Sequence, residues 1–352
     1  MNRAGRLVAL LEERSLDCLL VTDLVNVRYL TGFTGTNGAC LVSPEERTFF
    51  TDFRYVERAR SEVHGFDRLE AGREMLADIA RRMDGRAGFD DAHMSVRTHR
   101  QLGEKVEGGV ELVPAGGLVE RLREVKDAEE LRAMRAAAEI ADAAYERVRD
   151  QGLAGRRESE VARSIVRRME DLGAEGPSFP PIVAAGPQGA LPHAEARDVE
   201  IPAGVLVVLD VGARVDGYCS DCTRTFATGP LDDTALEVYE LVRRAQREAL
   251  GAARAGAARR EVDGVARRII EEAGHGERFG HGLGHGVGLE IHEDPRLTRV
   301  AQGTLAAGNT VTIEPGVYLP GSFGVRIEDL VAIGADGPEI LSGFPKELVT
   351  VG

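Results

Sequence analysis

Residues 204–227 read GVLVVLDVGARVDGYCSDCTRTFA and predict two paired strands joined by a tight turn. The apolar run from Val205 to Val211 predicts a buried strand. Asp216-Gly217 is typical of a two-residue hairpin turn. The strand contains one carboxylate, Asp210, and an ionised carboxylate in an apolar strand is costly unless it is paired or bound to a metal.

The hairpin turn sets the register between the two strands. It pairs Val215 with Tyr218 and, continued along the strands, places Gly212 opposite Asp221. Asp210 is then a diagonal neighbour of Asp221 on the same face, with α-carbons about 7–8 Å apart. Two carboxylates so placed repel each other, and a cation between them removes the conflict. The hairpin alone leaves two interpretations open: a metal site, or one aspartate at a strand end and the other paired with Arg224.

Cys219 and Cys222 form a C-x-x-C pattern within the same segment. A zinc ribbon needs a second pair, and Cys18 and Cys40 are not spaced to supply one. Residues three apart on a strand face opposite sides, so the two sulfurs should not meet. We therefore expect no zinc or redox role for these thiols.

Composition limits the class of protein. The 352 residues correspond to about two domains at roughly 150 residues each. The hydrophobic share of 43% and the charged share of 29% are typical of a globular protein. The net charge of −14 disfavours a nucleic-acid partner. No apolar run is long enough for a membrane helix, and the charged first twenty residues do not resemble a secretory signal, so we expect no membrane partner and a cytoplasmic location.

The pattern of segments predicts two domains, residues 1–122 and 123–352. In the first, strand-like runs at 19–22, 38–42 and 47–51 alternate with helix-like runs at 53–63, 73–82 and 118–123, which indicates a compact α/β domain.

The second domain has a more regular order. Asp127 with Glu130 resembles an N-terminal capping pair, and a long amphipathic helix follows from Leu131 to Val148. A second helix runs from Val161 to Leu172, and strands follow over 179–227. The order then repeats, with helices at 234–250 and 261–273 and strands to the end. The repeat indicates a duplicated helix-helix-strand block, and the whole chain is predicted to be α+β.

Residues 280–292 read GHGLGHGVGLEIH, with glycine at every second position from 280 to 288. The spacing fits neither phosphate-binding glycine motif, and it is not the H-E-x-x-H zinc motif. Glycines here are expected to let the backbone approach a ligand or a metal closely. Three histidines among them favour a functional site.

Two glutamates follow. Glu314 ends the β-branched run that starts at Thr310, and Glu328 is predicted to lie within a strand from Val325 to Leu330, with Arg326 on the same face. With Asp210, Asp221 and His285 they supply four carboxylates and one imidazole. That set suits a pair of divalent ions such as manganese, cobalt or zinc.

The segments LDVG, GYCSDCTRTF, HGLGHGVGLEIHE, TIEPGVY and VRIED together resemble the metal-dependent Xaa-Pro peptidases, aminopeptidase P and prolidase, of the pita-bread peptidase family. Residues 123–350 carry this resemblance. The N-terminal domain is similar to the creatinase-type domain of the same peptidases through NVRYLTGFTG and TDFRY. The expected architecture is a pita-bread catalytic domain preceded by that domain.

The resemblance also implies the site and its chemistry. It implies two divalent metal ions, manganese first and cobalt or zinc next, and five metal ligands: Asp210, Asp221, His285, Glu314 and Glu328. His193 and His292 would flank the scissile bond, His281 and Arg326 would line the site, and Glu314 could accept a proton from the attacking water. The substrate would be a peptide with proline at the second position, and the protein would be a homodimer.

Two alternatives remain. A sibling enzyme such as methionine aminopeptidase usually lacks the N-terminal domain. Non-catalytic peptide-binding modules on the same fold have usually lost metal ligands, whereas all five positions are present here.

Overall fold

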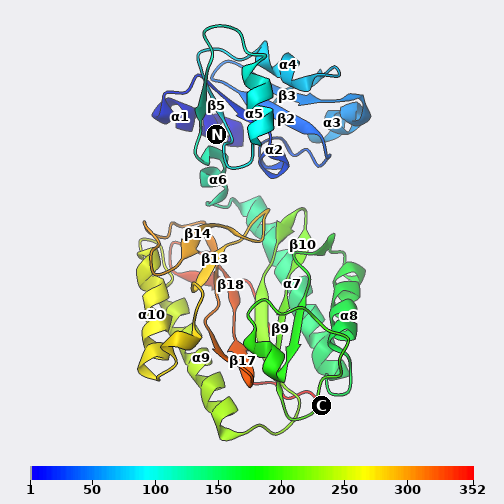
Figure 1. Cartoon of the computed structure of the whole chain (residues 1–352), viewed down its shortest axis with the longest axis vertical. Coiled ribbons are helices and arrows are strands. Elements are labelled where there is room, and N and C mark those ends of the chain that lie inside the picture. The colour runs from blue at the N-terminus through cyan, green and yellow to red at the C-terminus, as the bar shows by residue number, and fades with distance from the viewer. Residues whose placement is uncertain (1) are drawn as a thin grey trace. The chain divides into compact units, whose positions relative to one another are not determined.

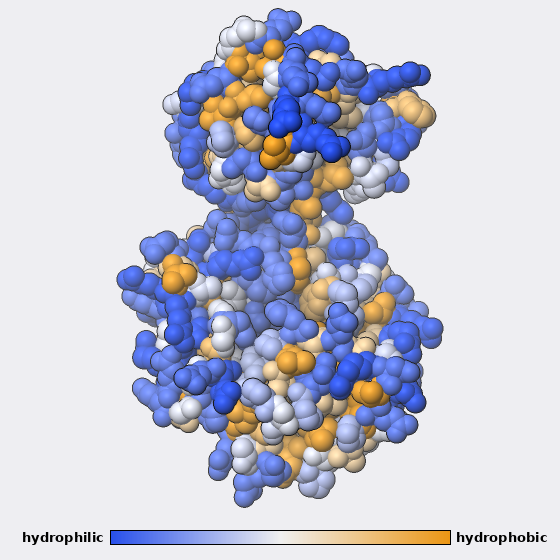
Figure 2. All heavy atoms as spheres, viewed as in Figure 1, coloured by the Kyte–Doolittle hydropathy of each residue, from blue (hydrophilic) through white to orange (hydrophobic). Residues whose placement is uncertain are grey.

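The computed structural model describes residues 2–352, and the chain divides into two compact units, Met1–Arg123 and Glu124–Gly352. Both units contain helices and strands, so the predicted α+β class is confirmed (Figure 1). In the view of Figure 2 the surface is mainly hydrophilic, with apolar residues in small scattered groups. Among the described residues, no helix combines the length and apolar character needed to cross a membrane.

The first unit contains a six-stranded mixed sheet in the order β4-β3-β2-β1-β5-β6. Its strands are β1 (Cys18–Val21), β2 (Gly38–Val42), β3 (Arg47–Thr51), β4 (Asp67–Glu70), β5 (Arg86–Phe89) and β6 (Glu111–Pro114). Its helices are α1 (Arg3–Arg14), α2 (Leu24–Thr31), α3 (Val56–Glu62), α4 (Met75–Ala80), α5 (Val96–Gly103) and α6 (Leu118–Arg123). The three predicted strands are confirmed. The helix predicted at 53–63 begins with a short 3-10 turn, η1 (Phe53–Tyr55), because the Asp52 side chain caps that turn separately.

The second unit places its strands between two pairs of helices. The helices are α7 (Ala128–Gln151), α8 (Glu158–Asp171), α9 (Asp233–Ala252) and α10 (Arg259–Glu272). In Figure 1 α7 and α8 lie on one side of the strands and α9 and α10 on the other. This arrangement agrees with the duplicated order predicted from the sequence.

The strands of the second unit form four sheets, ordered β11-β10-β7, β12-β9-β8, β14-β13-β15-β18-β19 and β16-β17. The strands are β7 (Gly176–Pro177), β8 (Ile182–Ala185), β9 (Leu206–Val211), β10 (Ala213–Val215), β11 (Tyr218–Cys219), β12 (Cys222–Ala227), β13 (Gly284–Gly286), β14 (Glu293–Leu297), β15 (Thr310–Ile313), β16 (Gly316–Leu319), β17 (Phe323–Arg326), β18 (Asp329–Ile333) and β19 (Pro338–Ile340).

Helix α7 supports the acidic hairpin. The helix begins at the capping box predicted for Asp127 and Glu130. The fully buried Tyr145 lies on its inner face, and its hydroxyl contacts the carbonyl oxygens of Leu209 at 3.0 Å and Cys222 at 2.6 Å. Those two residues lie on β9 and β12, so one buried side chain fixes the helix against both strands next to Asp210 and Asp221.

Candidate active site

The acidic hairpin has the predicted register. Val215 pairs with Tyr218, and the same register continues to Thr223 opposite Asp210. Asp216 and Gly217 have φ values of 49° and 80°. Both lie in the left-handed region that a two-residue turn of this type requires. The register therefore brings Asp221 and Asp210 to one side of neighbouring strands.

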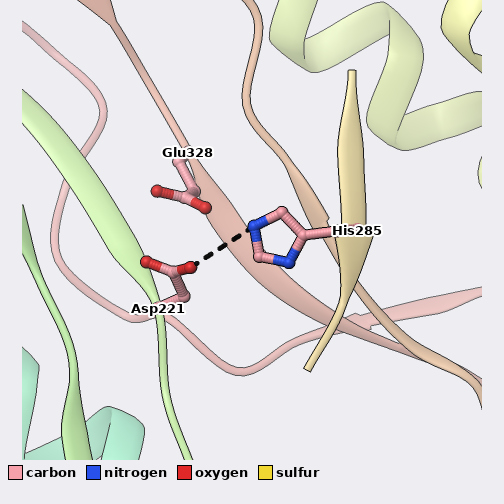
Figure 3. Close-up of side chains that lie close together, drawn as sticks. All are labelled: Asp221, His285 and Glu328. Atoms are coloured by element: carbon pink, nitrogen blue, oxygen red, sulfur yellow. Dashed lines mark ion pairs between the residues drawn. The ribbon is translucent and has the colours of Figure 1, made fainter. Parts of the chain in front are cut away.

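Three buried side chains from separate segments converge beside this hairpin. One ligand atom each of Asp221, His285 and Glu328 lies within 4.8 Å of the other two (Figure 3). In Figure 3 both carboxylates and the imidazole point toward one another. His285 Nε2 lies 3.6 Å from Asp221 Oδ2 and 3.3 Å from Glu314 Oε1, so Glu314 adjoins the same group.

Three carboxylate oxygens at this point lack protein partners. Asp210 Oδ1, Asp221 Oδ1 and Glu328 Oε1 are buried and accept no hydrogen bond from any described residue. A buried carboxylate oxygen without a partner costs free energy. Burial and the surrounding carboxylates raise the pKa of both Asp221 and Glu328, and burial raises the pKa of Glu314 to about 7. Divalent cations would satisfy the oxygens and cancel this repulsion, so the donor set fits metal ions.

The imidazole of His285 is oriented as a ligand. Its Nδ1 lies 3.0 Å from the Gly286 carbonyl oxygen, which can only accept, so Nδ1 carries the proton. Burial lowers the pKa of His285 to about 3, so the ring is neutral near pH 7. The lone pair is therefore on Nε2, which faces Asp221 and Glu314. Metal-binding histidines typically donate their other N–H to a carbonyl or carboxylate in this way.

Two of these carboxylates have their second oxygen held by the protein. Arg326 holds that of Asp210, and Thr223 holds that of Glu328. Arg326 donates from NH2 to Asp210 Oδ2 at 2.7 Å and from Nε to Thr223 Oγ1 at 2.9 Å. Because Nε can only donate, the Thr223 hydroxyl proton is free for Glu328 Oε2, 2.7 Å away. Asp210 and Glu328 thus each have one oxygen held by the protein and one left open. Sequence reasoning missed Thr223, although strand alternation places it on the same face as Asp221.

We expect Thr223→Val to weaken metal binding by about tenfold to a hundredfold, because outer partners of metal ligands have effects of that size. The substitution keeps the shape of the side chain but leaves Arg326 Nε and Glu328 Oε2 unpaired. Thr223→Ser keeps the hydroxyl and should bind metal nearly as the parent does. A calorimetric titration with metal measures the metal affinity of both variants. Equal affinity of the valine variant and the parent would show that this hydroxyl does not position Glu328.

His281 is held by a chain of hydrogen bonds. Its Nδ1 lies 2.7 Å from the Gly282 carbonyl oxygen, and burial lowers its pKa to about 4. The ring is therefore neutral with its lone pair on Nε2, which accepts from the Tyr318 hydroxyl at 3.0 Å. That hydroxyl in turn accepts from Arg326 NH1 at 3.0 Å. Both ring nitrogens are thus occupied within the protein.

His292 and His193 are more exposed than His281 and His285. The His292 ring lies edge-on to His285, with centroids 4.5 Å apart, and the residue is exposed. His193 is also exposed, on the loop after η2 (Gly186–Ala190). The carbonyl oxygen of the preceding Pro192 accepts from Arg326 NH1 at 3.1 Å. Both imidazoles are therefore accessible beside the acidic cluster.

All the predicted site residues line one cleft of about 1390 Å³ in the second unit. The nine are His193, Asp210, Asp221, His281, His285, His292, Glu314, Arg326 and Glu328. The structure therefore brings together side chains that are as much as 135 positions apart in the sequence, from His193 to Glu328. A cleft with converging polar groups and shifted pKa values is typical of an active site.

One detail of the backbone differs from expectation. Glu328 does not lie within a strand: β17 ends at Arg326 and β18 begins at Asp329, and this break turns Glu328 toward Thr223. Arg224 pairs with Asp329 at 2.9 Å, which removes the alternative of an Arg224 pair in the hairpin.

Two of the alternating glycines are required by the packing of the strands. A Cβ at Gly284 would lie 1.9 Å from the Thr312 carbonyl oxygen, and one at Gly286 would lie 2.3 Å from that of Asp294. Gly282 and Gly284 also line the cleft, and their close approach to a ligand or metal stays a prediction.

The prediction that the sulfurs of Cys219 and Cys222 do not meet is confirmed. All four cysteines are buried and form no disulfide. Cys222 Sγ lies 3.6 Å from the Glu328 carbonyl oxygen, whereas Cys219 Sγ lies 4.0 Å from that of Leu289.

Comparison with known proteins identifies relatives over the whole chain. Residues 132–335 match the metallopeptidase family M24, and residues 3–125 match the creatinase/prolidase N-terminal domain. A Xaa-Pro dipeptidase of Pyrococcus furiosus is 37% identical over 99% of both chains. The pita-bread architecture expected from the resemblance is confirmed by these matches and by the solved structures.

Two solved structures superimpose closely. A Xaa-Pro dipeptidase from Bacillus anthracis has a TM-score of 0.96 at 38% identity and covers 99% of both chains. An X-Pro aminopeptidase from Thermotoga maritima has a TM-score of 0.91 at 34% identity and covers 99% of this chain and 100% of its own.

Proposed function

The chain belongs to metallopeptidase family M24, and from this premise we propose that it hydrolyses the bond between an N-terminal residue and a following proline. Family membership makes the protein a metallopeptidase that uses divalent metal ions and acts on peptides. The observation that carries the proposal is the cluster of unpartnered, buried carboxylate oxygens around His285 Nε2 at the cleft. The proline preference rests on relatives named Xaa-Pro dipeptidase that match the chain over nearly its full length.

We assign two ions to the site, manganese first, with cobalt and zinc as substitutes. Asp210, Asp221, His285, Glu314 and Glu328 would hold them. The unpartnered oxygens of Asp210, Asp221 and Glu328 and the free Nε2 of His285 support this ligand set. When bound, such ions polarise a carbonyl and acidify water.

The chain's own residues would supply proton transfer and positioning. Glu314 is the candidate to take the proton from the attacking water, because it borders His285 and receives a hydrogen bond from Thr312 Oγ1 at 3.0 Å. Proline nitrogen must be protonated before it leaves. His193 and His292, exposed in the cleft, are the candidates to hold the carbonyl oxygen or to protonate that nitrogen. Arg326 is a positioning residue, because its donors are directed to Asp210, Thr223, Tyr318 and Pro192.

We further propose that the protein is a cytoplasmic homodimer. Four free cysteines fit a reducing compartment. The dimer follows from the family resemblance, and sedimentation velocity measures it directly.

A substrate panel tests the proposed reaction. In manganese buffer the protein should hydrolyse Ala-Pro and Met-Pro but leave Met-Ala and Ala-Ala largely intact. A methionine aminopeptidase would instead release methionine from Met-Ala-Ser. A non-catalytic module would release nothing from any peptide. Either of these results would contradict the proposed function.

A further inference from the structure

Helix α8 forms a long wall of the cleft. The residues that line it recur every three or four positions, so they share one face of the helix. They are Ser159, Ala162, Arg163, Val166, Arg167 and Glu170. At about 1.5 Å per residue, this face is roughly 16 Å long.

The wall is longer than a dipeptide requires. Two extended residues span about 7 Å. An enzyme that cuts after the first residue has one residue on the N-terminal side of the scissile bond. A peptide that contacts more of this wall therefore needs residues that follow the proline, because only one residue precedes the scissile bond.

The α8 wall carries two exposed arginines. Arg163 and Arg167 are exposed, lie four residues apart and take part in no ion pair among residues 2–352. The same two arginines also line an adjoining groove between α7 and α8, together with Arg147, Arg156 and Arg168. Two acidic residues, Glu170 and Glu195, also line the cleft. The adjoining groove contains Glu160, which pairs with Arg156 at 3.5 Å, and Asp171. Its arginines still outnumber these carboxylates, so on a chain of net charge −14 the groove is a local basic surface that attracts anions.

We propose that the α8 wall binds the acidic residues of peptides that extend beyond proline. This inference rests on the proposed function and deepens it: the substrates include acidic peptides of three or more residues as well as dipeptides. Arg163 and Arg167 would pair with carboxylates at the third and fourth positions, since guanidinium groups match carboxylates in geometry. Ala162 and Val166, on the same face of α8, supply apolar contact for the peptide chain.

The test uses one double variant and a matched control. Arg163→Ser/Arg167→Ser removes both charges from the wall. Arg260→Ser/Arg268→Ser makes the same change in net charge at exposed positions of α10 outside the cleft. Each manganese-loaded protein is assayed with Ala-Pro, Ala-Pro-Glu-Glu and Ala-Pro-Gln-Gln at low and high salt.

The parent should cleave Ala-Pro-Glu-Glu with a kcat/KM about threefold to tenfold above that for Ala-Pro-Gln-Gln, the range expected for two exposed ion pairs. This preference should disappear in the α8 variant, persist in the α10 control and decrease with salt. All three proteins should cleave Ala-Pro alike. If the parent cleaves Ala-Pro but does not prefer the acidic peptide, the inference is overturned and the proposed function stands. The same holds if the α8 variant keeps the acidic preference. If the parent cleaves none of the Xaa-Pro peptides, both the inference and the proposed function are overturned.

Discussion

Asp221→Ala is expected to abolish hydrolysis of Xaa-Pro substrates while leaving the fold intact. Asp221 is buried, its Oδ1 has no protein partner, and it lies within 4.8 Å of ligand atoms of His285 and Glu328. Its removal would take away a proposed metal ligand, so elemental analysis should find fewer ions per chain. The measurement is kcat with a Xaa-Pro dipeptide on protein of known metal content.

The metal-free proteins provide a second readout. Without metal, Asp221 is repelled by Glu328 and Asp210, and burial with this repulsion raises its pKa. The metal-free variant should therefore unfold at a temperature no lower than the metal-free parent. Asp233→Ala, at an exposed helix start, controls for loss of an aspartate and should keep full activity. A kcat near that of the parent in Asp221→Ala would show that the ligand assignment is wrong.

His193→Ala and His292→Ala should each retain both ions and lose kcat by on the order of a hundredfold, as for removed oxyanion donors in other enzymes. Both imidazoles line the cleft and are exposed, so both can reach a bound peptide. His292 packs edge-on to His285, which places it next to the metal ligands. His64→Ala, at an exposed position in the first unit, is the control and should leave kcat unchanged.

Metal content and kcat must be measured on the same preparations. Loss of metal in either variant would identify that histidine as a ligand. A kcat within a fewfold of the parent, with metal retained, would reduce it to a structural role. The two histidines can differ, so each is judged separately.

The acidic hairpin was predictable because its information is local. The Asp216-Gly217 turn fixes Val215 opposite Tyr218, and a side-chain period of two then brings Asp210 and Asp221 to one face. The same local reasoning predicted the capping box at Asp127. No contact between distant segments was needed for either result.

The rest of the site depends on contacts between distant segments. His285 lies on β13 of the five-stranded sheet, whereas Asp221 lies between β11 and β12 of two other sheets, and no turn signal specifies how these sheets meet. The family resemblance placed His285 among the predicted metal ligands. The contact between Thr223 and Arg326 joins residues about a hundred positions apart in the chain, so periodicity could not pair them. The packing that requires Gly284 and Gly286 is hidden in the sequence for the same reason, because their close neighbours lie on other strands.

Removal and return of metal shows whether hydrolysis depends on ions held by the acidic cluster. Protein treated with chelator, and shown by elemental analysis to be free of metal, should not hydrolyse Ala-Pro. Addition of manganese or cobalt should restore hydrolysis, with activity reaching its maximum at two ions per chain. Full hydrolysis of Ala-Pro by protein proven free of metal would contradict the account.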